Sequence, residues 1–176
     1  TSRELLPLLY SDIQSVAVCV SQDAALVRNI SGLGFDIIQI HGEISPEILD
    51  QIQTPVWQAV NLKNGMDPDL ILSHPKICAY VVDGAEYGGG KTFGLDAISG
   101  KESSSDDKRN VITGDIRTIL HGKKFILAGG LNIDNVAEGI ALFHPDIVDV
   151  SSGVETDGVK DSTLIHRFVR KVRDNS

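Results

Sequence analysis

The chain has 176 residues, enough for one domain with a single sizeable core. Hydrophobic residues make up 41% and charged residues 23%, near the averages of globular proteins, which excludes wholesale disorder. The net charge of −8 argues against nucleic acid and anionic membranes as partners. No apolar run approaches the ~20 residues that span a bilayer, and no secretory segment follows the N-terminus, so we expect a cytoplasmic protein.

The sequence predicts neither a metal site nor a cofactor. Cys19 and Cys78 lie in apolar runs that look like strands, and we expect buried free thiols in a reducing compartment. The alternative is a disulfide or a reactive thiol. No second His, Cys or carboxylate lies at metal-ligand spacing from His41.

Six short apolar runs recur along the chain and predict β-strands. Four of the five intervals between their starts are near twenty residues, the length of one strand plus one helix. The runs are almost continuously apolar, as parallel strands covered by helices are. The predicted strands are Val16–Val20, Ile37–His41, Val56–Val60, Ala79–Asp83, Phe125–Ala128 and Ile147–Ser151.

Helix signals fill the intervals. Helices are predicted to begin at Ser45-Pro46-Glu47 and at Asp67-Pro68, and a further helix follows Asn132 and ends before Pro145. Asp161 is predicted to cap the last helix. Its apolar stripe is predicted to be Leu164, Ile165, Phe168, Val169 and Val172.

Other segments are short or irregular. We expect a short helix over Ser2–Tyr10, with Ser2 as its cap, and another over Ile112–His121. Between Ser99 and Arg109 no aliphatic or aromatic side chain occurs, which predicts a mobile surface loop over residues 99–109.

The alternation of strands and helices predicts a parallel α/β fold, with residues 1–176 forming one domain. Two architectures remain open at this point. One is an open doubly wound sheet, and the other is a TIM-type barrel, which needs eight strands where six are found.

Glycines follow the last two predicted strands. Gly129 and Gly130 lead into a helix N-terminus, and Ser152 and Gly153 follow the final strand. In TIM-type barrels a phosphate often binds at this position, where glycines let backbone N–H groups approach the ligand. We therefore predict a phosphate site at these four residues. The alternative is that the glycines only form turns.

Other polar residues follow the earlier strands. Asp83 ends an apolar strand, where a carboxylate is costly unless it is hydrogen-bonded or functional, so it is a candidate general acid or else a turn residue. The glycine loop Gly84–Lys91 predicts a lid over a ligand, with Lys91 as a candidate anion contact. Gln39 and His41 are weaker candidates, because a strand-end histidine more often serves packing.

Several short motifs occur along the chain, and together in this order they are more specific than any one of them alone. They are Val16–Val20, Ile37–Glu43, Val82–Asp83, Glu86–Phe93, Gly129–Val136, Val148–Glu155, Gly158 and Lys160-Asp161. In this order they resemble phosphoribosylanthranilate isomerase, a (βα)8-barrel family of tryptophan biosynthesis. The resemblance covers nearly the whole chain and matches its six strands to strands 3–8 of the family, so the fold it implies is an incomplete TIM-type barrel.

The resemblance implies a cofactor-free Amadori rearrangement of N-(5'-phosphoribosyl)anthranilate. By this resemblance Asp83 matches the general acid that protonates the ring oxygen. Gly129, Gly130, Ser152 and Gly153 match the phosphate site, and Gln39 and His41 face the anthranilate region.

The family's first strand, which carries a cysteine as general base, has no counterpart in these 176 residues. The resemblance therefore implies weak or absent activity of this chain alone. Three functions remain open: an isomerase completed by another chain or segment, a non-catalytic phosphosugar-binding relic, and a plain scaffold. A sheet lacking two strands would expose its edges, so we also expect a homodimer through the open side of the barrel.

Overall fold

The computed structural model describes residues 2–20, 23–42, 44–61, 71–83 and 116–176. The chain divides into two compact units. The first comprises Thr1–Val60 and Leu72–Tyr80, and the second comprises Asn61–Ile71 and Val81–Ser176.

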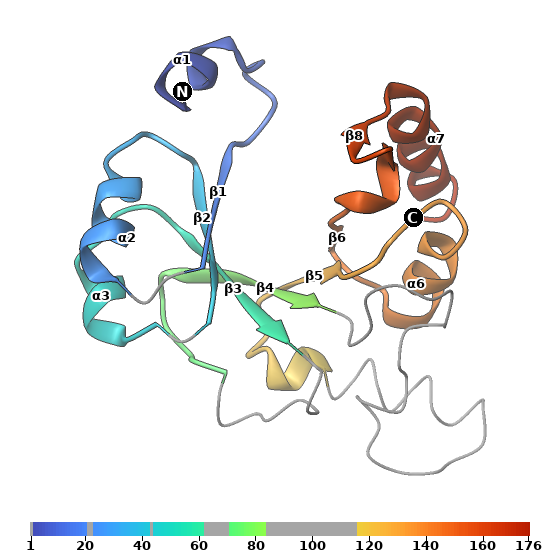
Figure 1. The fold of residues 1–176 in the computed structure, drawn as a ribbon. Helices are drawn as coiled ribbons and strands as arrows, with labels where there is room; N and C mark the ends of the chain where they lie inside the picture. Colours follow the sequence, from blue (N-terminus) through green and yellow to red (C-terminus); the bar gives the residue numbers. More distant parts are fainter. Residues whose placement is uncertain (1, 21–22, 43, 62–70, 84–115) are drawn as a thin grey trace. The chain divides into compact units, whose positions relative to one another are not determined.

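The first unit contains alternating strands and helices (Figure 1). It begins with a single helical turn, α1, and a 3-10 turn, η1. Its elements are α1 (Ser2–Leu5), η1 (Leu6–Leu8), β1 (Val16–Cys19), α2 (Ala24–Ser31), β2 (Ile37–His41), α3 (Pro46–Asp50), β3 (Val56–Asn61) and the first part of β4 (Ile77–Asp83).

The second unit continues the alternation from the end of β4 and adds a small hairpin before the last helix (Figure 1). Residues 116–119 are helical. The elements that follow are β5 (Lys124–Ala128), α6 (Val136–Phe143), β6 (Ile147–Val148), η3 (Ser152–Val154), β7 (Glu155–Thr156), β8 (Val159–Lys160) and α7 (Ser162–Arg173).

The strands β1 to β6 form one sheet in chain order, β1-β2-β3-β4-β5-β6. The pairs β1–β2, β2–β3 and β5–β6 are parallel, with Val16 opposite Ile37 and Ile126 opposite Ile147. A doubly wound sheet reverses its strand order at a switch point, whereas a barrel winds in one direction. The observed order therefore agrees with the predicted barrel-type α/β fold and not with the doubly wound alternative.

The central strands are buried, as their apolar runs predict. Ile38, Ile40 and Val56 are fully buried in the first unit, and Phe125 and Ile126 are fully buried in the second. Removing such side chains from water supplies the main stabilisation of the fold, about 1.5–3 kcal/mol for each large aliphatic side chain.

An aspartate directly before a strand clamps the start of the preceding strand in both units. In the first unit Asp36 precedes β2, and its carboxylate accepts hydrogen bonds from the backbone and hydroxyl of Ser15, each at 2.7 Å. In the second unit Asp146 precedes β6 and accepts from the backbone N–H of Phe125 at 2.8 Å and from Arg117 at 3.2 Å. These bonds lower the pKa of both carboxyl groups, with the bonds to the backbone N–H of Ser15 and of Phe125 as the largest causes.

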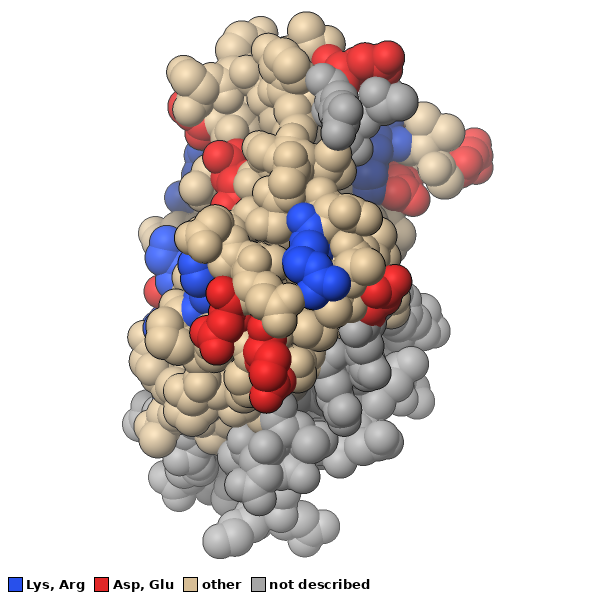
Figure 2. Space-filling model, turned by 90° about the vertical axis from the view of Figure 1, so that its left-hand side faces the viewer, with Lys and Arg blue, Asp and Glu red and all other residues tan. Residues whose placement is uncertain are grey.

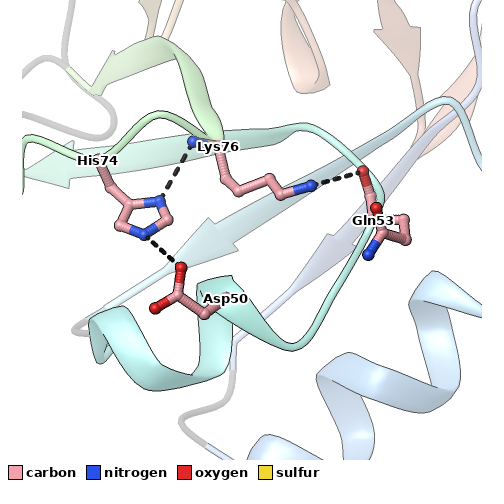
Figure 3. Close-up of polar contacts among 4 residues, drawn as sticks. All are labelled: Asp50, Gln53, His74 and Lys76. Atoms are coloured by element: carbon pink, nitrogen blue, oxygen red, sulfur yellow. Dashed lines mark hydrogen bonds and ion pairs between the residues drawn. The ribbon is translucent and has the colours of Figure 1, made fainter.

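A histidine ties α3 to the segment that enters β4 (Figure 3). His74 accepts at Nδ1 from the backbone N–H of Lys76 at 3.2 Å, and its Nε2 lies 3.3 Å from Asp50 Oδ1. Since Nδ1 accepts a hydrogen bond, Nε2 is the donor in the contact with the Asp50 carboxylate. The Lys76 ammonium donates to the carbonyl of Gln53 at 3.4 Å, so three polar contacts fix this corner.

Several predicted boundaries are wrong. The last strand was predicted to reach Ser151 but ends at Val148. One further hydrogen bond joins Asp149 N–H to the Leu127 carbonyl at 2.8 Å. Beyond it β5 ends at Ala128, and Gly129 follows with a φ of 84°, so residues after Asp149 have no β5 residue to pair with. The predicted helix over Ser2–Tyr10 ends at Leu8 as two short turns, because Pro7 interrupts α-helical hydrogen bonding.

Helix caps are also partly different from the prediction. The helix α3 begins after Ser45, but the Ser45 side chain makes no capping bond and instead hydrogen-bonds Glu47. In the helix that follows Asn132, Asn135 occupies the N-cap position, but its side chain makes no capping hydrogen bond. Asp161 caps α7 as predicted, accepting from the N–H groups of Thr163 and Leu164 at 2.8 and 3.2 Å.

The apolar stripe of α7 is only partly buried. Phe168 is buried, whereas Ile165 and Val169 are 38% and 41% exposed. The predicted stripe therefore buries Phe168 and leaves Ile165 and Val169 partly in contact with solvent. In the first unit, Val18 and Val20 at the edge strand β1 are 62% and 80% exposed.

The two cysteines are free thiols, as expected, but only Cys19 is buried. Cys78 is half-buried, and its Sγ lies 3.5 Å from the Val56 carbonyl. Burial raises the pKa of the Cys19 thiol, which disfavours its thiolate form.

Charged side chains of both signs are interspersed among uncharged ones on the face shown in Figure 2. Among the helices that the structure describes, none has the length and apolar character needed to cross a membrane. The predicted helix start at Asp67-Pro68, the glycine loop with Lys91, the loop over residues 99–109 and residues 112–115 lie outside the described residues.

Candidate active site

The loop after β5 is a glycine turn held by side-chain amides. Gly129 and Gly130 have φ angles of 84° and 66°, which favour glycine. Asn135 donates from Nδ2 to the Gly130 carbonyl at 3.0 Å, and its Oδ1 accepts from the Asn132 N–H at 2.8 Å. The Asn132 side chain in turn accepts from the N–H groups of Asp134 and Asn135 at 2.8 and 3.2 Å. The loop is therefore fixed at the start of α6.

The loop after β6 turns sharply into η3. Ser151 has φ −119° and ψ −91°, outside the common backbone regions, and η3 follows at Ser152. A Cβ built on Gly153 would lie 1.8 Å from the Leu131 carbonyl oxygen and 3.0 Å from Asn132 Cα. The backbone of this loop therefore lies directly against the backbone of the loop after β5.

These two loops bring the four predicted phosphate-site residues together within the second unit. Gly130 and Ser152 are exposed, and Gly129 and Gly153 are half-buried, so an anion can reach their backbones. Closely packed glycine backbones beside the N-terminus of a helix, here the eight-residue α6, are an arrangement in which backbone N–H groups can bind an anion. The arrangement suits a phosphate group better than a neutral ligand.

A two-stranded hairpin supports the second of these loops. Its strands β7 and β8 pair Glu155 with Lys160 across an Asp157-Gly158 turn. The φ angles of 52° and 76° at the turn residues fit the type I′ turn that Asp-Gly favours. Lys160 donates from Nζ to the carbonyl oxygen of Ser151 at 2.9 Å and pairs with the Glu155 carboxylate.

The candidate acid, Asp83, is the last residue of β4 and is half-buried. Val81 and Val82 before it are 1% exposed, so the strand leaves the core at Asp83. The Asp83 side chain therefore lies at the C-terminal end of its strand. In parallel α/β folds this end of the strands holds the chemistry.

Gln39 and His41 lie on the same strand of the first unit. Both belong to β2 and point to the same face, since they are two residues apart. Gln39 is 6% exposed, and its Nε2 lies 3.0 Å from His41 Nε2. The structure therefore places the Gln39 and His41 side chains in contact with each other. Lys91 lies outside the described residues.

Sequence reasoning did not assign two residues that the structure places at the glycine loops. Asn135 was only part of a matching segment, and its side chain bonds back to the loop at Asn132 rather than capping α6. Lys160 was noted only as part of a matching motif, and no sequence spacing predicts its reach to Ser151. Within the described ranges, no three His, Cys, Asp or Glu side chains cluster as a metal site would require.

Comparison with known proteins decides the family. The family model described as N-(5'phosphoribosyl)anthranilate (PRA) isomerase matches residues 8–171, almost the entire chain. The chain belongs to the phosphoribosylanthranilate isomerase family. This confirms the resemblance drawn from the sequence motifs.

Individual members of the family are similar over the same length. The isomerase of Clostridium acetobutylicum is 37% identical over 178 residues, covering 98% of this chain and 78% of that protein. The crystal structure of the isomerase from Thermotoga maritima matches with a TM-score of 0.75 at 27% identity, covering 98% of this chain and 79% of the other. A further crystal structure, 22% identical with a TM-score of 0.69, covers 98% of this chain and 78% of the other. It is of the isomerase in complex with reduced 1-(o-carboxyphenylamino)-1-deoxyribulose 5-phosphate.

Proposed function

We propose that this chain acts as a phosphoribosylanthranilate isomerase of tryptophan biosynthesis, converting N-(5'-phosphoribosyl)anthranilate by an Amadori rearrangement. Family membership over residues 8–171 is the main support. The structural observation that supports the proposal is the close approach of the Gly153 backbone to Leu131, which brings the two glycine loops together.

In this proposal the glycine loops bind the substrate phosphate. Backbone N–H groups of Gly129, Gly130, Ser152 and Gly153 donate to the phosphate oxygens, and α6 contributes its dipole. A phosphorylated ligand is bound in a solved structure of the family, which supports the assignment of the ligand class. Anchoring the phosphate fixes the reacting end of the sugar and lowers the entropic cost of reaction.

Asp83 serves as the general acid. Its protonated carboxyl group donates a proton to the furanose ring oxygen, the ring C–O bond breaks, and a general base removes the C2' proton. The resulting enolamine tautomerises to the ketone. Gln39 and His41 lie on the anthranilate side, and Lys91 is proposed as a contact to a substrate anion.

No described residue is assigned the role of the base. Cys19 is buried in β1 with a raised pKa, and Cys78 lies toward the start of β4, so neither thiol suits the task. We therefore keep weak turnover by these 176 residues as part of the proposal. The two free cysteines also fit a reducing compartment, which supports a cytoplasmic location.

The test is turnover of N-(5'-phosphoribosyl)anthranilate by the purified chain, followed by loss of anthranilate fluorescence. Slow turnover that Asp83→Asn abolishes would support the proposal. Phosphate binding without any turnover would favour a non-catalytic phosphosugar-binding protein, and the absence of both would leave only a scaffold.

We also propose that the chain forms a homodimer through the edge of the sheet at β1. This strand is first in the sheet order, so one of its sides has no partner strand among the described residues. Val18 on this strand is strongly exposed, and so is Val20, which directly follows it. An exposed apolar edge strand pairs readily with a second copy, and two-fold pairing is the commonest symmetry.

A further inference from the structure

The Lys160 ammonium bridges the hairpin to the start of the loop after β6. It donates to the Ser151 carbonyl oxygen at 2.9 Å, lies 3.3 Å from the Ser151 hydroxyl, and pairs with the Glu155 carboxylate. An ammonium has three N–H donors, so these three acceptors use its full capacity. Its side chain is 51% exposed, so burial of the alkyl chain alone does not explain this geometry.

The backbone around Lys160 is fixed from both sides. The type I′ hairpin places Lys160 opposite Glu155, and the next residue, Asp161, donates its N–H to the Val154 carbonyl at 2.9 Å. The Asp161 side chain accepts from the Thr156 hydroxyl at 3.0 Å and caps α7. The Lys160 backbone is therefore held between a short hairpin and the first turn of a helix. This fixes the point from which its side chain reaches Ser151.

The group that Lys160 contacts belongs to the proposed phosphate site. The carbonyl of Ser151 and the N–H of Ser152 are the two ends of one peptide unit. A cation bound at the carbonyl oxygen polarises that unit and makes its N–H a stronger donor, because hydrogen bonds along a chain reinforce one another. The same contact fixes the orientation of a peptide whose preceding residue has an uncommon backbone conformation.

We propose that Lys160, anchored by Glu155, is a positioning residue of the phosphate site: it orients and polarises the Ser151–Ser152 peptide so that its N–H donates to the substrate phosphate. This inference rests on the proposed function, and it assigns to the Lys160 side chain a role in ligand affinity without direct contact with the ligand.

The competing explanation is that Lys160 only closes the hairpin through its pair with Glu155. That role would change stability but not the affinity of a folded protein for phosphate. The two explanations are separated by measuring both quantities on the same variants. Lys171→Gln, which removes the same charge from the exposed side of α7, is the matched control.

The experiment titrates the full chain with inorganic phosphate and follows backbone amide NMR signals. In the wild type, the signals of Ser152 and Gly153 should shift with phosphate. Lys160→Gln should raise the Kd about tenfold, the effect of one charge-assisted hydrogen bond. Lys160→Arg, which retains donors and charge, should restore the affinity to within about threefold, and Lys171→Gln should bind as the wild type does.

Urea unfolding of each variant completes the test. An unchanged Kd in folded Lys160→Gln would overturn the inference, whatever its urea midpoint. Should Lys160→Gln fail to fold, Glu155→Gln decides the matter, because it removes the anchor but keeps the ammonium and should still weaken phosphate binding several-fold. Wild-type signals that do not respond to phosphate would instead remove the proposed phosphate site itself.

Discussion

Gly153 lies so close to Leu131 that a Cβ on Gly153 would stand 1.8 Å from the Leu131 carbonyl oxygen. Real Cβ atoms do not approach backbone oxygen at this distance, and the obstacle is backbone rather than a flexible side chain. Any side chain at position 153 must push the loop after β6 away from the loop after β5. The glycine therefore sets the spacing of the proposed phosphate site.

We expect Gly153→Ala to destabilise the protein and weaken phosphate binding together. Overpacking against fixed backbone typically costs about 1–3 kcal/mol. Gly32→Ala is a suitable control, because its Cβ would meet the nearest atom at 3.5 Å and its φ of −79° suits alanine. Urea midpoints and phosphate titrations of both variants check this. A Gly153→Ala protein as stable as the wild type would mean that the two loops are less closely packed.

Replacing the candidate acid should affect catalysis more than structure. We expect Asp83→Asn to lower kcat by about 10²–10⁴, the usual contribution of one acid–base group, while phosphate affinity stays within a few-fold. Steady-state kinetics of the purified chain with N-(5'-phosphoribosyl)anthranilate measure this. Asp174→Asn, at an exposed aspartate that follows α7 in the same unit, is the control. A change of kcat within a few-fold would withdraw the assignment of Asp83.

The aspartate clamps predict a loss of stability in acid. The pKa of Asp146 and of Asp36 is lower in the folded protein than in the unfolded chain, where it is about 3.9. The folded state therefore binds fewer protons, and stability rises with pH through this range. The contribution is complete above about pH 5 and is lost as the pH falls below 4 and through the lowered folded-state pKa.

Urea unfolding from pH 6 to pH 2 tests this prediction. Asp146→Asn should lower the midpoint at pH 6 and flatten its fall in acid, because the amide side chain does not titrate in this range. Asp12→Asn, an exposed aspartate of the first unit, should keep the slope of the wild type. Equal slopes in the wild type and Asp146→Asn would mean that the clamp does not contribute.

All six strands were predictable because each is a short apolar run, and four of the five intervals between them are near twenty residues. The spacing of chain segments is a local property, and the strand order follows from repeated right-handed strand–helix units. The end of β6 was not predictable, because Val148 and Val150 continue the apolar pattern while the partner strand has already turned away at Gly129. The end of a strand depends on where its neighbouring strand ends. The sequence of one segment does not show this.

The proposed phosphate residues were predictable from glycines after consecutive strands, and Asp83 from a carboxylate that ends an apolar strand. The side chains that hold those loops were not. Lys160 acts over nine residues through a hairpin, and its contact with Ser151 depends on the pairing of Glu155 with Lys160. Only the folded hairpin shows which carbonyl its ammonium reaches.

The last prediction concerns the edge of the sheet at β1. Val18 is 62% exposed on a strand that has no partner on one side among the described residues. If two copies pair through this edge, light scattering at micromolar concentration should give twice the chain mass of 19.0 kDa. Val18→Lys should shift the protein toward the single-chain mass, because a lysine on an edge strand opposes pairing with another chain. Val159→Lys, at a valine that is 69% exposed in the hairpin, should leave the mass unchanged. A wild-type mass of 19.0 kDa would exclude the homodimer, and a dimer that Val18→Lys leaves intact would place its interface elsewhere.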